Sequence, residues 1–93
     1  MKIVFKDTFV LRLESQLEYI ASNNPHNARV FKNDLFQKIK AIPNHPLKHR
    51  KSIYFNDPTI RDLIFKGYTI IYRINNEQIV VFGFVKHQSS NTD

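Results

Sequence analysis

Apolar residues in the first half of the chain recur every three or four positions in two stretches, which predicts two amphipathic helices. A short apolar run at residues 3–5 precedes them and predicts a strand. Asp7 and Thr8 suit the cap of the first helix, and Asn24 followed by Pro25 suits the start of the second. A few residues between them make an antiparallel helical hairpin. Its apolar positions are Val10, Leu13, Leu17 and Ile20, then Ala28, Phe31, Leu35, Ile39 and Ile42.

The C-terminal third changes to short apolar runs separated by turn residues, a pattern typical of strands. Residues 61–65, 68–74 and 78–85 are the predicted strands. Lys66-Gly67 and Asn75-Asn76 are the predicted turns, since glycine and asparagine tolerate positive φ. The sequence therefore predicts an α+β fold of the order β-α-α-β-β-β, with the hairpin packed on one face of a small, mostly antiparallel sheet.

The last two predicted strands place apolar residues on both faces of the sheet. With Ile74 and Glu77 beside the turn, Tyr72 pairs with Ile79, and Ile70 with Val81 on the same face. Two helices can cover one face only, so the second face is either lightly covered or made for a partner, and a partner is favoured. That second face is expected to carry Arg73 with Gln78, Ile71 with Val80, and Thr69 with Phe82.

Length and composition narrow the class of protein. The 93 residues suffice for one domain, 1–93, of which 88–93 is expected to be a flexible tail. The chain contains no cysteine, so disulfides and thiolate metal sites are excluded. No apolar run approaches the ~18 residues of a membrane span, and the first residues are too charged for a signal peptide. A cytoplasmic protein without a membrane partner is expected.

Charge gives the first indication of function. The net charge is +6, and residues 35–56 contain no acidic residue. The loop expected between the second helix and the sheet carries Lys48, His49, Arg50 and Lys51. Such a one-signed surface attracts nucleic acid or an acidic protein, although a solvated basic loop that only aids solubility has the same composition.

The order of these segments resembles the RelE/ParE superfamily of bacterial toxins from type II toxin–antitoxin systems. The helical part of the resemblance is residues 19–25 followed by Ala28, Phe31 and Leu35. The strand part is residues 61–63, 68–74 and 79–81 with Lys86-His87, so nearly the whole chain is covered. The resemblance implies a growth-arresting toxin and a co-expressed acidic antitoxin that lays an extended or helical segment across it.

The superfamily acts by two mechanisms, and the resemblance implies different roles for the residues of this chain under each. RelE-like members cleave mRNA on the ribosome without a metal, and by position Arg61, Arg73 and His87 would be the catalytic residues. ParE-like members inhibit DNA gyrase instead. No tyrosine follows Tyr72, and the acid-free stretch lacks the glutamate that some ribonucleases use as a base. The helical hairpin with Asn24-Pro25 is closer to the ParE branch, so gyrase inhibition is favoured and an mRNA endonuclease is the alternative.

The remaining site residues follow from the same comparison. No cofactor is expected, and the histidines have no spacing that predicts a metal site. A non-toxic module that binds nucleic acid through its basic surface is a third hypothesis, and each residue could also be an ordinary surface or core residue. Predicted contacts to nucleic acid or the target are Lys48, Arg50, Lys51, Arg61, Arg73 and Lys86. Predicted contacts to the antitoxin are Tyr72, Phe82 and Phe84.

Overall fold

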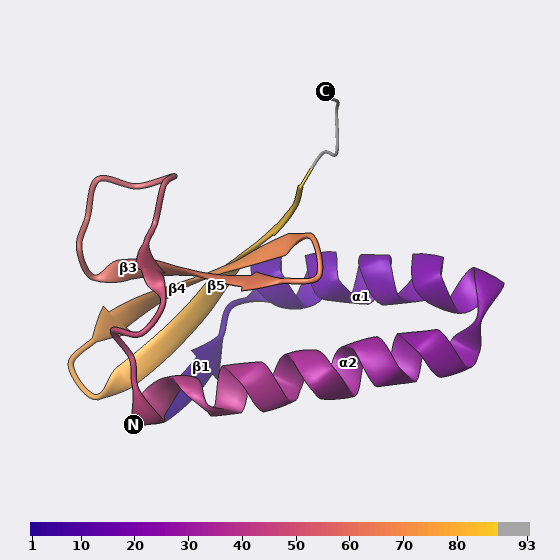
Figure 1. The fold of residues 1–93 in the computed structure, drawn as a ribbon, viewed down its shortest axis with the longest axis horizontal. Coiled ribbons are helices and arrows are strands. Elements are labelled where there is room, and N and C mark those ends of the chain that lie inside the picture. Colours follow the sequence, from indigo (N-terminus) through magenta and orange to yellow (C-terminus); the bar gives the residue numbers. More distant parts are fainter. Residues whose placement is uncertain (88–93) are drawn as a thin grey trace.

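A computed structural model describes residues 1–87, and in that range two α-helices and five strands form one α+β unit (Figure 1). The strand order is β1-β5-β4-β3-β2; β1 runs parallel to β5 and the other pairs are antiparallel. The predicted fold class is confirmed, whereas the predicted flexible tail, 88–93, lies outside the described residues. The elements are β1 (Lys2–Phe5), α1 (Asp7–Asn23), α2 (Pro25–Lys40), the 3-10 helix η1 (Ile42–Asn44), β2 (Arg50–Lys51), β3 (Ile60–Phe65), β4 (Tyr68–Asn75) and β5 (Gln78–Lys86).

The helix boundaries follow local capping chemistry at α2 but not at α1. The Asn24 side chain accepts a hydrogen bond from the Asn27 amide at 3.1 Å, and Pro25 occupies the first turn, as predicted. The cap position of α1 is Lys6, which makes no capping bond through its side chain. The expected cap Asp7 instead lies in the first turn, where its carboxylate favours the positive end of the helix dipole.

The helical hairpin covers one face of the sheet with an apolar core. Side chains from α1 and α2 pack against alternate residues of β3, β4 and β5, because successive strand residues point to opposite faces. The buried members of this cluster are Phe9, Leu13, Phe31, Leu35, Ile39, Ile42, Leu63, Phe65, Tyr68, Ile70, Tyr72, Ile79, Val81 and Phe84.

The β4–β5 hairpin turns one residue later than predicted. Asn75 pairs with Gln78, so Asn76 and Glu77 form the turn, with Asn76 at φ 53°. Tyr72 consequently pairs with Val81 rather than with Ile79. The shift is two residues in register, which leaves the paired residues 72–75 and 78–81 on their predicted faces.

A β-bulge then changes the register within the same hairpin. Tyr72 pairs with Val81 but the preceding Ile71 pairs with Gly83, so Phe82 is the extra residue. Beyond the bulge Phe84 faces the helices. A Cβ at Gly83 would lie 2.8 Å from the Ile71 Cβ, so the close approach of the two strands here requires glycine.

The second face of the sheet is covered in part by the chain itself. The segment 52–59, which stands at the left of Figure 1, returns across that face, and the rings of Phe55 and Phe82 meet with centroids 5.6 Å apart. Ile60 and Ile71 are buried there. The alternative of a lightly covered face therefore describes this part of the sheet, and the binding of a partner to it stays a prediction. The short strand β2 was not predicted, because two basic residues show no apolar alternation.

Within residues 1–87, no helix has both the length and the apolar character needed to cross a membrane.

Candidate functional site

Arg61 holds the basic loop against the sheet. It lies on the helix-covered face of β3, paired with Tyr72. Its Nε donates to the Pro58 carbonyl at 3.2 Å, and its terminal nitrogen donates to the carbonyls of His49 at 3.1 Å and Leu47 at 3.5 Å. The guanidinium is thus occupied by backbone acceptors from two parts of the loop.

Asp62 holds the following stretch on the opposite face. Its buried Oδ2 accepts from the Arg50 side chain at 3.2 Å and from the Ile53 amide at 3.0 Å. Its Oδ1 is buried and has no hydrogen-bond partner in the described part of the chain. Adjacent residues of β3 therefore fasten the loop on both sides of the sheet edge, which fixes the basic residues between them.

Tyr72 supplies a third attachment. Its hydroxyl donates to the Pro46 carbonyl at 2.7 Å, and the ring of His49 packs edge-on with centroids 6.1 Å apart. Burial disfavours the phenolate and raises the pKa of Tyr72 to about 12, although nearby Arg61 acts in the opposite direction. The Tyr72 hydroxyl is therefore protonated near neutral pH and can donate this bond.

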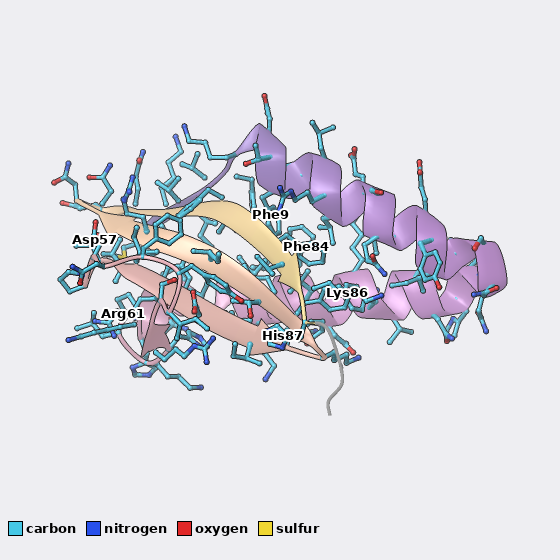
Figure 2. All side chains as sticks on the ribbon, turned by 90° about the horizontal axis from the view of Figure 1, so that it is seen from above. Phe9, Asp57, Arg61, Phe84, Lys86 and His87 are labelled. Carbon is cyan, nitrogen blue, oxygen red and sulfur yellow. The ribbon has the colours of Figure 1, made fainter. Side chains whose placement is uncertain are left out.

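The three residues predicted as catalytic do not meet. Arg61 faces the helices, whereas Arg73 pairs with Ile60 on the second face, where its guanidinium lies 5.9 Å from the Phe82 ring centroid. His87 lies beyond the far end of β5, and its Nε2 hydrogen-bonds the hydroxyl of Thr69 (Figure 2). Thr69 precedes Arg73 by four residues, or about 13 Å along an extended strand. A base and a phosphate-binding cation must both reach one ribose phosphate, which this placement does not provide.

A loop turn lies beside Arg73. The Asp57 carboxylate accepts from the Thr59 hydroxyl at 2.7 Å and from the Thr59 amide at 2.9 Å. These bonds, with a smaller contribution from Arg73, lower the pKa of Asp57, so this carboxylate is ionised near neutral pH and is not a proton donor.

The remaining predicted cations lie apart from one another. Lys86 is at the far end of the sheet, its Nζ 5.6 Å from the Tyr19 ring centroid, and Arg50 is ion-paired with Asp62. Lys48 and Lys51 are exposed on the loop between η1 and β3. Neither of these two lysines has an ion pair among residues 1–87.

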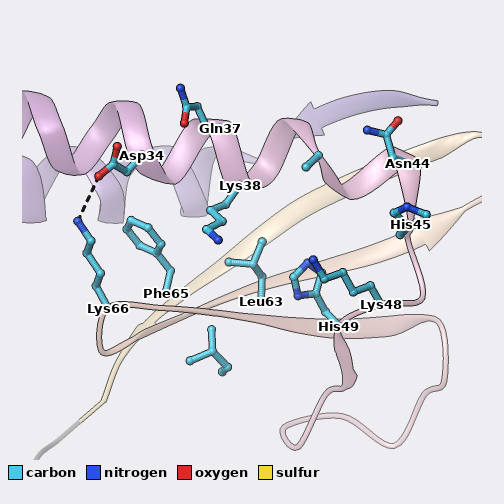
Figure 3. Close-up of a pocket in the computed structure, with 12 residues that line it drawn as sticks. Asp34, Gln37, Lys38, Asn44, His45, Lys48, His49, Leu63, Phe65 and Lys66 are labelled. Atoms are coloured by element: carbon cyan, nitrogen blue, oxygen red, sulfur yellow. Dashed lines mark hydrogen bonds and ion pairs between the residues drawn. The ribbon is translucent and has the colours of Figure 1, made fainter.

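A groove between the C-terminal half of α2 and β3 concentrates the positive charge (Figure 3). Its volume is about 670 Å³. The ion pair of Asp34 with Lys66, at 3.3 Å, closes one end, and the loop closes the other. The sequence did not predict this groove, because the packing of α2 against β3 cannot be obtained from spacing. The residues that line it are Asp34, Gln37, Lys38, Ala41, Asn44, His45, Lys48, His49, Leu63, Ile64, Phe65 and Lys66.

The pKa of His49 reflects the positive charge of that groove. Burial, followed by the charges of Lys48 and Lys38, lowers the pKa of His49 below its ordinary value of 6.5. The imidazole is therefore neutral at pH 7, because the neighbouring lysines oppose a further positive charge.

The predicted antitoxin contacts are divided between the two faces. Tyr72 is fully buried, and Phe84 is buried in the core, stacked on Tyr68 at 4.9 Å. Phe82 is half-buried on the second face. A partner could reach Tyr72 or Phe84 only if the helices moved away from the sheet, so Phe82 is the one of the three available to a docked segment.

In residues 1–87 no three His, Cys, Asp or Glu side chains gather in a way that could hold a metal ion.

Comparison with known proteins identifies the family. Residues 3–92 match the family described as the ParE toxin of the type II toxin–antitoxin system parDE. The chain belongs to the ParE toxin family. The predicted membership of the RelE/ParE superfamily, and of its ParE branch, is thereby confirmed.

A solved structure supports the fold of this ParE family member. The chromosomal ParDE toxin–antitoxin system from P. aeruginosa superposes with a TM-score of 0.76 at 13% sequence identity. The alignment covers 95% of this chain and 97% of that one. No match was found among curated proteins. At this identity the structural match establishes the fold, and the function has to be argued from the site.

Proposed function

We propose that this ParE family member arrests bacterial growth by binding and inhibiting DNA gyrase, and that an acidic antitoxin of the ParD kind neutralises it. The toxin acts by occupying a surface of its target rather than by cutting a substrate. Membership of the ParE family supports the proposal, as does the arrangement of the site.

The main support for binding rather than catalysis is the separation of the predicted catalytic residues. The residues that a ribonuclease would need, Arg61, Arg73 and His87, lie on different faces or at different ends of the sheet. Arg61 also donates to three backbone carbonyls, so its side chain serves the loop and not a phosphate. This arrangement favours a protein whose loop is held in one shape for recognition.

The surface proposed to meet gyrase is the exposed part of the basic loop, including Lys51 on the edge strand β2. Because Arg61, Asp62 and Tyr72 fix the loop at several points, little conformational entropy remains to be lost on binding. The net charge of +6 favours an acidic protein surface as the partner, for the target and for the antitoxin alike.

The test compares two assays on one preparation of the full chain. In the first, bacterial gyrase supercoils relaxed plasmid with ATP in the presence of the protein. In the second, translating ribosomes receive the protein and new ends on the message are mapped by primer extension. We expect supercoiling to be inhibited and the message to remain intact.

Matched variants sharpen both assays. Lys51→Glu reverses a charge on the proposed surface, and Lys2→Glu makes the same change on the exposed edge strand β1 at the other side of the sheet. Gyrase inhibition should weaken in the first variant and persist in the second. Ribosome-dependent cuts that vanish in His87→Ala would overturn the proposal in favour of an mRNA endonuclease. Direct nucleic-acid binding with neither effect would favour a non-toxic binding module.

A further inference from the structure

The groove between α2 and β3 runs along an open edge of the sheet. Strand β2 pairs only with Arg61 and Asp62, so within residues 1–87 the rest of β3 has no neighbouring strand on that side. The carbonyl of Ile60 faces this edge, since it accepts from the Ser52 amide at 2.9 Å. Backbone groups alternate along a strand, which places the amide and carbonyl of Ile64 on the same open side.

This edge presents an exposed apolar side chain on the second face and cationic side chains in the groove on the helix-covered face. Ile64 is 48% exposed and pairs with Thr69 on the second face, so an added strand could cover its side chain there. Lys38 and Lys48 line the groove from the helix and from the loop, while Lys66 is already neutralised by Asp34 (Figure 3). An occupant therefore needs a backbone that can pair with Ile64, an apolar side chain to cover it, and two negative charges.

We propose that this groove binds an extended acidic segment of a partner protein, which adds to β3 as a short strand in line with β2 and places its carboxylates at Lys38 and Lys48. The inference rests on the partner half of the proposed function, because it assigns the acidic segment of the antitoxin a seat. It does not depend on gyrase being the target.

A peptide fits these features better than a nucleic acid does. A nucleic acid could neutralise the lysines, but it has no backbone that completes a β-ladder at Ile64. Phe65 is buried with 5% of its surface exposed, which leaves the imidazoles of His45 and His49 as the stacking surfaces that the groove offers a base. Edge pairing and covering of Ile64 are both interactions that an extended peptide with alternating apolar and acidic residues makes at once.

The experiment titrates the full chain with a short synthetic peptide, blocked at both ends, in which glutamate and valine alternate. Backbone amide NMR reports the binding site, and fluorescence anisotropy of the labelled peptide reports the affinity. We expect the Ile64 amide to shift and to become protected from hydrogen exchange, because it gains a hydrogen-bond acceptor. The same peptide with glutamine in place of glutamate should bind more weakly.

Charge-matched variants locate the carboxylates. The double variant Lys38→Gln with Lys48→Gln should bind the acidic peptide about tenfold more weakly, as expected for two partly exposed charge contacts. Lys2→Gln with Arg29→Gln removes the same charge from surfaces outside the groove and should change affinity by less than about twofold. Neither pair contributes to the buried core, so both variants should keep the melting temperature of the parent.

Three outcomes would overturn the inference. The peptide could fail to bind, its affinity could fall equally in both double variants, or the Ile64 amide could stay unprotected from hydrogen exchange when the peptide is bound. Preferential binding of an RNA oligonucleotide, with shifts at Lys38 and Lys48 but not at the Ile64 amide, would assign the groove to nucleic acid. Because gyrase supercoiling is measured on the same protein, inhibition without peptide binding would reject the groove assignment alone.

Discussion

The two faces of the sheet differ in what covers them and in how the cover is held. On one face, α1 and α2 pack against the sheet through apolar side chains such as Phe9 and Leu35, both fully buried. On the other, the segment 52–59 is held by the Asp62 carboxylate and the contact of Phe55 with Phe82. The helices are held by non-directional apolar contacts that many residues share. The segment 52–59 is held by a few specific contacts.

This difference bears on function, because the loop that crosses the sheet edge carries the basic residues. A few bonds at Arg61, Asp62 and Tyr72 decide the shape of the loop, while the stability of the molecule comes mainly from the helix-covered core. Variants can therefore change loop order and global stability separately, and the expected effects are given from the largest to the smallest.

Leu35→Ala should have the largest effect, because it opens a cavity in the helix-covered core. We expect a loss of about 3 kcal/mol in the free energy of unfolding. Urea denaturation followed by circular dichroism measures it. The loss should appear as lower protection from hydrogen exchange in both helices and the central strands together. An effect confined to one element would contradict a single shared core.

Asp62→Ala should come next and act chiefly on the loop. Removing the carboxylate leaves the Ile53 amide and the half-exposed Arg50 without their acceptor, at a cost of about 2 kcal/mol. Limited trypsin digestion of Asp62→Ala should cut faster after Lys51. Leu35→Ala, compared at a urea concentration that gives it the same free energy of unfolding, should show no preference for cleavage after Lys51. Asp62→Asn keeps an acceptor oxygen, so its cleavage rate after Lys51 should lie between those of the parent and Asp62→Ala. Unchanged cleavage in Asp62→Ala would refute the fastening role of this carboxylate.

Tyr72→Phe removes one hydrogen bond and keeps the ring in the core. The loss of the bond to the Pro46 carbonyl should cost about 1 kcal/mol. Trypsin should cut faster after Lys48, near this attachment, with little change after Lys51. A variant as stable as the parent, with the same digestion pattern, would mean that the hydroxyl does not hold the loop.

The smallest effect is the pH dependence from His49. Its pKa is lowered in the folded protein by burial and by Lys48 and Lys38, so the unfolded chain binds the proton more readily. The stability associated with neutral His49 is fully present above about pH 6.5 and is lost as the pH falls through 6.5 toward the lowered pKa. The groups facing the ring include Lys38, Lys48 and Tyr72.

The measurement is the free energy of unfolding across this pH range in the parent and in His49→Gln. The parent should lose stability more steeply than the variant as the pH falls. Equal slopes would show that His49 does not sense the lysines of the groove.

The helix-covered face was largely predictable from the sequence, and the loop-covered face was not. A repeat of three and four identified Leu13, Phe31 and Leu35 as core residues, because helical periodicity is a local property. The bulge at Phe82 arises where Ile71 approaches Gly83, which is a contact between strands and leaves no periodic signal. It turned Phe84 into a core residue, although the sequence had grouped it with Phe82.

For the candidate site too, the sequence predicted some features and missed others. The sequence identified Arg61 and Lys48 as candidate site residues, but nothing in it predicted that Arg61 would donate to carbonyls of the chain's own loop. The groove between α2 and β3 depends on how the helix that ends at Lys40 packs against the strand that begins at Ile60. The charged composition of residues 35–56 was visible in the sequence, but the pairing of Lys66 with Asp34 was not.

The central claim, that this ParE family member arrests growth by binding and not by catalysis, is tested most directly by expressing His87→Ala in growing bacteria without antitoxin. His87 carries the candidate general base and is itself exposed, with hydrogen bonds to the Thr69 side chain and the Gly67 carbonyl but no place in the apolar core, so its loss should leave the fold intact. The account predicts growth arrest equal to that of the parent, with purified variant still inhibiting gyrase. Loss of arrest in a variant with the parent's melting temperature would contradict it.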